Sequence, residues 1–341
     1  MKALRLIRRG HVMLDDVDVP NPPPGHLRVR TEAATICTSD LNDIRANPFD
    51  IPLPVTLGHE GAGVVAEVAS DVDGFAVGDR VAAHPVHPCG RCDACRAGTG
   101  HLCSAMGHFG INMPGTFATS FIVRADRARK VGDLPGPLAA LAEPVCVCLQ
   151  ALAQTTGRPG ERLLILGDGP FGAMLAILAA ARGFGEVVVG GHHDFRLGFA
   201  TGATTINLAR NDGADRLAAA AETMGFDRAV LAVGAASAVA TALGHLRPKG
   251  RLVVFSAVHE PTPLDLLAVH TRELEIVGAC NDEDRLDEAI EFLRVQADPL
   301  GRLITHTVPL PRYGQALDLA AHSRETAMKV AFTFDDAEAD A

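Results

Sequence analysis

Short apolar runs separated by Pro and Gly make up the first 145 residues of the chain. The clearest runs are residues 27–30, 63–68 and 79–82, in which apolar and polar positions alternate. A period of two places alternate side chains on one buried face. The pattern predicts short strands of a barrel-like β domain.

A different pattern begins near Pro144. A helical segment at 145–153 leads into near-continuous apolar runs that alternate with Ala-rich helical stretches. The expected strands are residues 162–166, 186–189, 204–207, 227–233, 251–255 and 274–277. Apolar strands alternating with helices predict a parallel sheet covered on both faces. Six such strands fit a complete doubly wound, Rossmann-type dinucleotide fold, so the predicted fold class is α/β.

The chain beyond residue 280 returns to a mixed pattern. An amphipathic helix is expected at 286–293, a strand at 304–308 and a second helix at 313–321. Residues 335–341 are acidic and are expected to fray.

A glycine motif, Gly167-Asp168-Gly169-Pro170-Phe171-Gly172, follows the first strand of the predicted parallel sheet and opens a helix. In this context the glycines let a pyrophosphate approach the free N–H groups of the helix N-terminus. We therefore predict a nicotinamide dinucleotide site here and treat Asp168 as structural. Val233, the last residue of the fourth expected strand, and Gly234 after it are assigned to the same site.

The end of the second strand bears on the choice of cofactor. NAD-dependent folds place Asp or Glu there, about twenty residues after the glycines. In this chain that position is Gly190 or Gly191, followed by His192, His193 and Arg196. A missing carboxylate beside basic side chains suits a 2′-phosphate, so the sequence favours NADP over NAD. The alternative is that the histidines are solvated loop residues.

Eight side chains have the types and spacing of two metal sites. Cys89, Cys92, Cys95 and Cys103 form a C-x2-C-x2-C-x7-C run. Such spacing is poor for disulfides and good for a closed, structural zinc site. Cys37, the pair His59-Glu60 and Glu143 are dispersed, as in an open, catalytic site. His84, His87, His101 and His108 are expected to be polar loop residues, and Cys146, Cys148 and Cys280 to be buried.

Bulk properties restrict the partners. The formal net charge is -10, which disfavours nucleic acid as a main partner. The N-terminal segment lacks a signal-peptide pattern, and no run of about 18 apolar residues suggests a membrane span. We expect a cytoplasmic protein that acts on a small molecule, with no nucleic-acid or membrane partner.

Over essentially its full length the chain resembles the zinc-containing medium-chain alcohol and polyol dehydrogenases. The resemblance is carried by Cys37-Thr38-Ser39-Asp40, Gly58-His59-Glu60-x2-Gly63-x5-Ala69-x2-Val72, Gly78-Asp79-Arg80-Val81 and Glu143-Pro144. It implies a GroES-like catalytic domain made of both chain ends, residues 1–145 and 282–341, with a structural zinc lobe at about 86–105. It also implies a Rossmann domain at 146–281, an active site between the two domains, and a homodimer or homotetramer.

The resemblance also implies residue roles. Cys37, His59 and Glu143 would bind the catalytic zinc, and Glu60 could enter its coordination shell. Asp40 would orient His59, and Ser39 would pass the substrate proton outward. Asn42 stands where the family commonly has a relay histidine, which leaves either Asp43 or solvent to end the relay.

The implied activity is hydride transfer between an alcohol and NAD(P) at zinc, with two zincs per chain. Secondary alcohols and polyols are the expected substrates. Two alternatives stay open: a specialised biosynthetic carbonyl reductase with the same chemistry, and a cofactor-binding protein without catalysis. The complete set of candidate ligands favours an enzyme.

Overall fold

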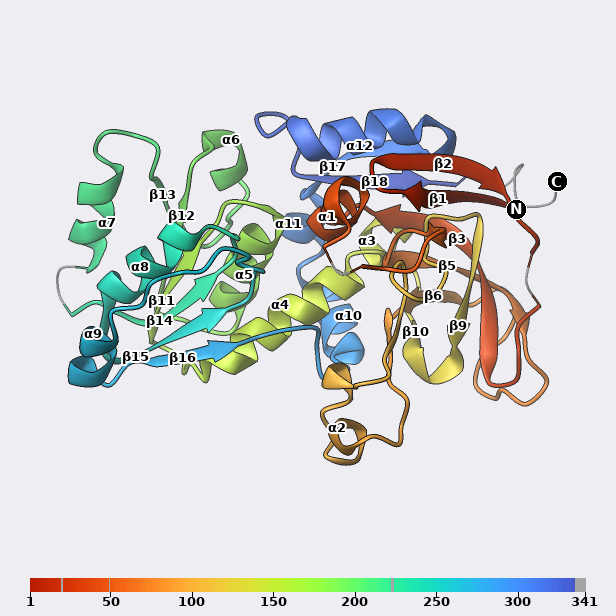
Figure 1. Ribbon diagram of the computed structural model, residues 1–341, viewed down its shortest axis with the longest axis horizontal. Helices are drawn as coiled ribbons and strands as arrows, with labels where there is room; N and C mark the ends of the chain where they lie inside the picture. The colour runs from red at the N-terminus through yellow and green to blue at the C-terminus, as the bar shows by residue number, and fades with distance from the viewer. Residues whose placement is uncertain (20, 49, 222–223, 335–341) are drawn as a thin grey trace.

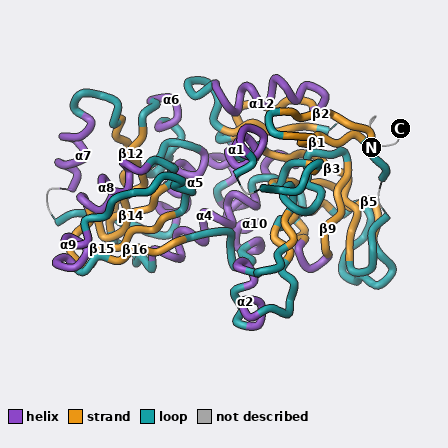
Figure 2. Tube along the Cα trace, viewed as in Figure 1, coloured by secondary structure: helices purple, strands orange, loops and turns teal. Residues whose placement is uncertain are grey.

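A computed structural model of the protein describes residues 1–19, 21–48, 50–221 and 224–334. Within these residues a β-rich unit and a parallel-sheet unit lie side by side, with helices α4 (Ala142–Thr155) and α10 (Leu286–Val295) between them (Figure 1). The strands form two separate groups (Figure 2). The expected fraying at 335–341 falls outside the described residues.

The β-rich unit contains strands from both ends of the chain. Its larger sheet has the order β10-β6-β5-β3-β18-β17, and β9 pairs with a second stretch of β3. These strands are β3 (His26–Thr35), β5 (Glu60–Val68), β6 (Arg80–Ala83), β9 (Ser120–Arg124), β10 (Ala128–Lys130), β17 (Ile304–Pro309) and β18 (Lys329–Thr333). Only β17 and β18 pair in parallel. A second sheet, β2-β1-β4, joins β1 (Lys2–Arg8), β2 (His11–Asp16) and β4 (Val55–Thr56).

The second unit is built on a six-stranded sheet whose neighbours all pair in parallel. Its order, β13-β12-β11-β14-β15-β16, is that of a complete dinucleotide fold. The strands are β11 (Arg162–Leu166), β12 (Glu186–Gly191), β13 (Thr204–Asn207), β14 (Phe226–Leu231), β15 (Leu246–Val254) and β16 (Glu275–Gly278). Helices between them are α5 (Pro170–Ala181), α6 (Asp194–Leu197), α7 (Gly213–Ala221), α8 (Ala236–His245) and α9 (Leu266–Arg272).

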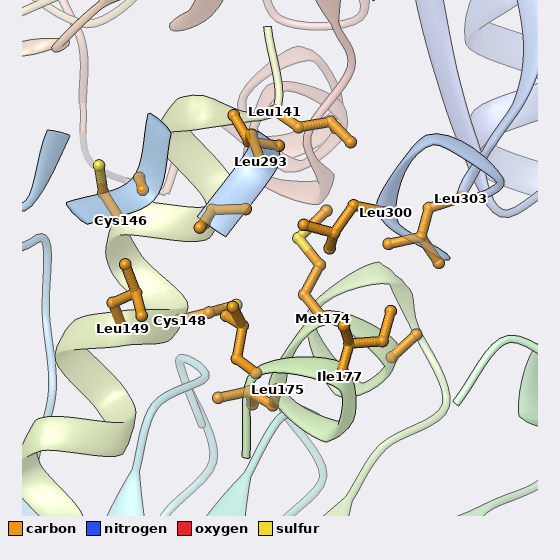
Figure 3. Packing of buried hydrophobic residues seen from close by; sticks show 14 of the residues in the cluster. Leu141, Cys146, Cys148, Leu149, Met174, Leu175, Ile177, Leu293, Leu300 and Leu303 are labelled. Carbon is orange, nitrogen blue, oxygen red and sulfur yellow. The ribbon is translucent and has the colours of Figure 1, made fainter. Parts of the chain in front are cut away.

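Both faces of the parallel sheet are buried, which explains its near-continuous apolar strands. Leu163 and Ile165 of β11 belong to the core that contains α4 and α5, whereas Leu164 and Leu166 face the core that contains α8. Figure 3 shows side chains of α4, α5 and α10 meeting in the first core. Because that core also includes Ala33, Ala62 and Ala82 of β3, β5 and β6, it joins the two units.

One helical stretch, 136–155, which includes α3 (Gly136–Ala139) and α4, is long and apolar enough to cross a membrane by length and composition. However, 83% of its most apolar window is buried inside the protein. It is the central core helix between the two units, as its contacts with α5 and α10 indicate.

The fold class predicted from the sequence is confirmed, and all six parallel strands are present. The chief differences are that β15 begins five residues early, at Leu246, and that β14 ends at Leu231. The remaining elements are α1 (Thr38–Ala46), α2 (Asp93–Arg96), α11 (Ala297–Gly301), α12 (Tyr313–His322), β7 (Val86–His87) and β8 (Gly107–His108). The domain boundaries at 145/146 and 281/282 stay a prediction.

Candidate active site and metal centres

Three of the predicted catalytic-site residues meet in the interior of the β-rich unit. The Cys37 Sγ, a ring nitrogen of His59 and a carboxylate oxygen of Glu60 all lie within 4.8 Å of one another. All three side chains are buried. Cys37 precedes α1, and the other two lie at the start of β5, so strand pairing between β3 and β5 brings residues 22 positions apart together. One thiolate, one imidazole and one carboxylate are suitable zinc ligands.

Asp40 holds two of these residues in place. One of its carboxylate oxygens accepts a hydrogen bond of 2.8 Å from the Cys37 backbone N–H at the start of α1. Its other oxygen lies 3.3 Å from Nδ1 of His59. Because Nδ1 is engaged, Nε2 is the His59 nitrogen left to bind a metal. Nε2 lies 3.4 Å from the Ser39 hydroxyl oxygen.

The charge around His59 is negative. Burial alone lowers the pKa of His59, but the Asp40 carboxylate and the Cys37 thiolate raise it well above its usual value. An environment that attracts a proton to this imidazole attracts a cation for the same reason. Metal binding in this cluster therefore competes with protons.

Glu60 is held by a lysine that the sequence interpretation missed. The Lys329 ammonium lies 2.6 and 2.8 Å from its two carboxylate oxygens, and the Thr35 hydroxyl donates to the same group. The Lys329 and Glu60 side chains are 3% and 0% exposed. Since a buried charge needs a partner, this pair fixes the Glu60 side chain. The signal in the sequence was a lysine inside the apolar run 327–332.

Glu143 lies outside the three-atom group. It occupies the first turn of α4, is buried, and accepts no hydrogen bond from any residue that the structure describes. Burial, followed by the charge of Glu60, raises the pKa of Glu143 to about 8, against the opposing effect of His59. A buried carboxylate without a partner is costly, so this position calls for a cation or a proton.

The two candidates for the outer end of a proton relay differ in their surroundings. The Asn42 side-chain oxygen Oδ1 accepts a hydrogen bond from the Arg45 guanidinium. Asp43 is buried, and its Oδ1 forms no hydrogen bond with the part of the chain that the structure describes. Burial and the nearby Asp40 charge raise the pKa of Asp43 to about 6.

The four-cysteine lobe has the geometry of a tetrathiolate site. Sulfur–sulfur distances are 3.5 Å for Cys92–Cys95, 3.7 Å for Cys92–Cys103 and 4.0 Å for Cys89–Cys95. Zn–S bonds of about 2.3 Å in a tetrahedron place sulfurs about 3.8 Å apart. All eight cysteines are free, so the donor set fits zinc and contains no disulfide.

The four histidines near this lobe were expected to be polar loop residues, and three of them, His84, His87 and His101, are buried. Nε2 of His84 lies 2.9 Å from a carboxylate oxygen of the buried Asp282. The expectation that Cys280 is buried is wrong. Cys280 is exposed because it follows the end of the edge strand β16, whereas Cys146 and Cys148 lie inside α4 and are buried.

The glycine loop has the local geometry that a pyrophosphate needs. Gly167 has φ +128°, and a Cβ there would meet the Ala232 carbonyl oxygen at 2.6 Å. A Cβ at Gly172 would collide with Gly167, whereas Gly169 faces open space directly before α5. The loop thus packs against the segment after β14, which also contains Val233 and Gly234. Pro170 and Phe171 form the first turn of α5.

The carboxyl end of β12 has a carboxylate that the sequence interpretation did not place there. The sequence favoured NADP because Gly191 offers no carboxylate, yet Asp168 places one there: its Oδ2 accepts hydrogen bonds from the backbone N–H groups of His192 and His193. The side chain of Arg196 donates to the carbonyl oxygens of Arg324 and Ala327. The premise that no carboxylate stands at this strand end is therefore wrong.

Comparison with known proteins agrees with this geometry. Residues 23–133 match the family model of the alcohol dehydrogenase GroES-like domain, and residues 170–294 match that of the zinc-binding dehydrogenases. D-altritol 5-dehydrogenase of Agrobacterium fabrum is 34% identical over 91% of this chain and 93% of its own.

Solved structures give the same result. A zinc-binding dehydrogenase from Sinorhizobium meliloti bound to NADP has a TM-score of 0.91 at 27% identity and covers 97% of this chain and 98% of its own. An alcohol dehydrogenase from Escherichia coli complexed with NADH has a TM-score of 0.91 at 25% identity, covering 98% and 99%.

Proposed function

Because this chain belongs to the zinc-containing alcohol and polyol dehydrogenase family, we propose that it interconverts a secondary alcohol or polyol with its ketone. The family membership makes it a zinc-dependent, NAD(P)-linked oxidoreductase. The observation that carries the site assignment is the buried group of Cys37, His59 and Glu60 ligand atoms within 4.8 Å. The relative that oxidises D-altritol supports a polyol-like substrate.

Cys37, His59 and Glu143 hold the catalytic zinc in this proposal. Glu143 is favoured over Glu60 as the third ligand, because Glu60 already has Lys329 as its counter-ion, while Glu143 forms no ion pair with any described residue. Glu60, whose carboxylate oxygen lies within 4.8 Å of the Cys37 and His59 ligand atoms, could serve as a further ligand. A bound zinc supplies Lewis acidity toward the substrate oxygen.

The protein's own groups then position and move the proton. Asp40 fixes the His59 tautomer through Nδ1 and anchors the start of α1 through the Cys37 N–H. Ser39, beside Nε2 of His59, is placed to hydrogen-bond the substrate hydroxyl and to pass its proton outward. The buried setting of the site excludes water from the reacting groups.

A second zinc is proposed in the four-cysteine lobe, giving two per chain. The sulfur–sulfur spacing of Cys89, Cys92, Cys95 and Cys103 supports it. Four thiolates complete a tetrahedron and leave no place for substrate. This site is therefore structural. Eight free thiols also support a reducing, cytoplasmic location.

A homo-oligomer is proposed from one exposed surface. The edge strand β16 exposes 37% of Ile276, and neighbouring Leu264, Leu266 and Leu267 are 42%, 68% and 70% exposed. An edge strand beside large exposed apolar side chains is suited to pairing with another chain.

Zinc content per chain tests the two-site proposal. Purified wild-type protein should contain two zincs, and Cys37→Ala should contain one, because it removes a ligand of only the catalytic site. Cys148→Ala, a buried cysteine outside both groups, is the control and should keep two. Turnover of a polyol panel with NAD and NADP should be lost in Cys37→Ala alone. One zinc in both wild type and Cys37→Ala would contradict the catalytic site.

A further inference from the structure

We propose that Asp168 is the carboxylate that binds the adenosine ribose hydroxyls and makes the enzyme select NAD(H) over NADP(H). The inference rests on the proposed function, since it concerns the cofactor of that reaction. It assigns to the glycine loop a role that dinucleotide folds ordinarily give to the end of the second strand.

Strand register brings Asp168 to that position. β11 pairs in parallel with β12, with Leu166 opposite Gly190. Asp168 follows Leu166 by two residues, so its side chain reaches the carboxyl end of β12. There Oδ2 accepts hydrogen bonds of 2.6 Å from the His192 N–H and 2.7 Å from the His193 N–H, and lies 3.0 Å from the His193 ring. This is the edge of the sheet at which such folds bind the ribose.

Gly191, at the end of β12, leaves the space that the Asp168 side chain occupies. A Cβ on Gly191 would lie 2.4 Å from the Asp168 Cβ and 2.8 Å from its carboxylate carbon, distances at which one group must move. The strand end consequently has no room for an acidic side chain of its own. In this protein the acidic residue, Asp168, lies in the glycine loop, and Gly191 occupies the end of β12, where dinucleotide folds usually have the acidic residue.

One oxygen of Asp168 is available to a ligand. Oδ2 carries all three contacts, while Oδ1 accepts no hydrogen bond from the described residues, and the side chain is 13% exposed. Although burial alone raises the pKa of Asp168, the hydrogen bonds from His192 and His193 hold it below its usual value. The group is therefore an ionised acceptor at neutral pH.

An ionised acceptor distinguishes the two cofactors. Ribose hydroxyls donate hydrogen bonds that a carboxylate accepts, whereas a 2′-phosphate brings negative charge and only acceptors at this pH. The nearby His193 ring is already paired with Asp168, and Arg196 is engaged by the carbonyl oxygens of Arg324 and Ala327. Neither offers a free cation to a phosphate.

Titration of NADH and NADPH binding, followed by dinucleotide fluorescence and calorimetry, tests the proposal without turnover. Wild-type protein should bind NADH at least tenfold more tightly than NADPH. Asp168→Asn keeps an oxygen for the backbone N–H groups but loses the charge. It should weaken NADH binding by roughly tenfold or more, as for a lost charged hydrogen bond, and leave NADPH binding equal or tighter.

The control is Asp194→Asn, which removes an exposed acid in the same turn that bonds Asn207 and Arg210 instead. Its NADH to NADPH ratio should match wild type. If Asp168 only braces the loop, Asp168→Asn will weaken both dinucleotides in parallel, and the proposal fails. A wild-type preference for NADPH overturns it as well.

An exchange variant gives an independent test. Gly191→Asp alone should lower stability, because its side chain collides with Asp168. Asp168→Gly with Gly191→Asp moves the acid to the strand end and should restore NADH preference. Stable double-variant protein without that preference contradicts the proposal. If wild type binds neither dinucleotide, the proposed function itself fails and this inference with it.

Discussion

At the scale of single residues, His87 is a titratable side chain buried without hydrogen-bond partners. It is 5% exposed and packs on Phe109 with ring centroids 4.9 Å apart, and neither ring nitrogen has a hydrogen-bond partner among the described residues. Burial, and then the charges of Arg124 and Arg127, lower its pKa to about 3. The folded protein therefore keeps this imidazole neutral under mildly acidic conditions.

Stability should fall in acid because of His87. The unfolded chain binds a proton near the ordinary pKa of about 6.5, whereas the folded chain does not until about pH 3. The histidine's contribution is thus fully present above pH 6.5 and is lost as pH falls below it. Between pH 7 and 5 the loss is about 2 kcal/mol.

The variant His87→Phe removes this titration while keeping a ring against Phe109. Urea unfolding at pH 7 and pH 5 should show a smaller loss of unfolding free energy for His87→Phe than for wild type, by about 2 kcal/mol. Equal losses in the two proteins would mean that His87 is protonated in the folded state.

Sequence reasoning succeeds at the residue scale where chemistry is local. The four cysteines of the lobe lie in one loop, so their spacing alone predicted that they meet. It failed where partners are distant: Lys329 lies 269 residues from Glu60, and Asp168 reaches the end of β12 only through strand register. The direction of the Asp168 side chain in the glycine loop cannot be inferred from the residue types. The sequence argument for NADP therefore assumed, wrongly, that no carboxylate lies at the end of β12.

At the scale of elements, β18 brings a buried charge to the site. It pairs with β3 and in parallel with β17, and its first residue, Lys329, contacts Glu60 of β5 across β3. The sequence predicted β17 and the helix after it. It contained no sign of which strands pair with β17 or β3. Pairing order is set by contacts between the two ends of the chain, which local periodicity does not encode.

Replacing Lys329 by Met should leave the Glu60 carboxylate buried with only the Thr35 hydroxyl to oppose its charge. Removing one partner of a buried pair costs about 3–5 kcal/mol, so the unfolding free energy of Lys329→Met should fall by that amount in chemical denaturation. The double variant Lys329→Met with Glu60→Gln should recover most of it. A loss below about 1 kcal/mol in the single variant would contradict a strong buried pair.

At the scale of the whole molecule, the exposed edge at β16 and α9 is the surface proposed for self-association. Ile276→Lys with Leu267→Lys places charges on it, which edge strands use to prevent pairing. Light scattering after gel filtration should give a multiple of the 35.7 kDa chain mass for wild type and a lower multiple for the variant. Val295→Lys, 67% exposed on α10, is the control. Unchanged mass in both would rule out this surface.

The position of β18 also has a consequence for the order in which the molecule is made. A ribosome releases the amino-terminal strands first, but residues 33–35 of β3 pair with β18, which follows the whole parallel sheet in the chain. During translation these residues remain an unpaired strand edge, prone to join another chain. The six-stranded sheet is continuous in sequence and can form meanwhile. The β-rich unit closes, and Glu60 gains its counter-ion, only when the last strand emerges.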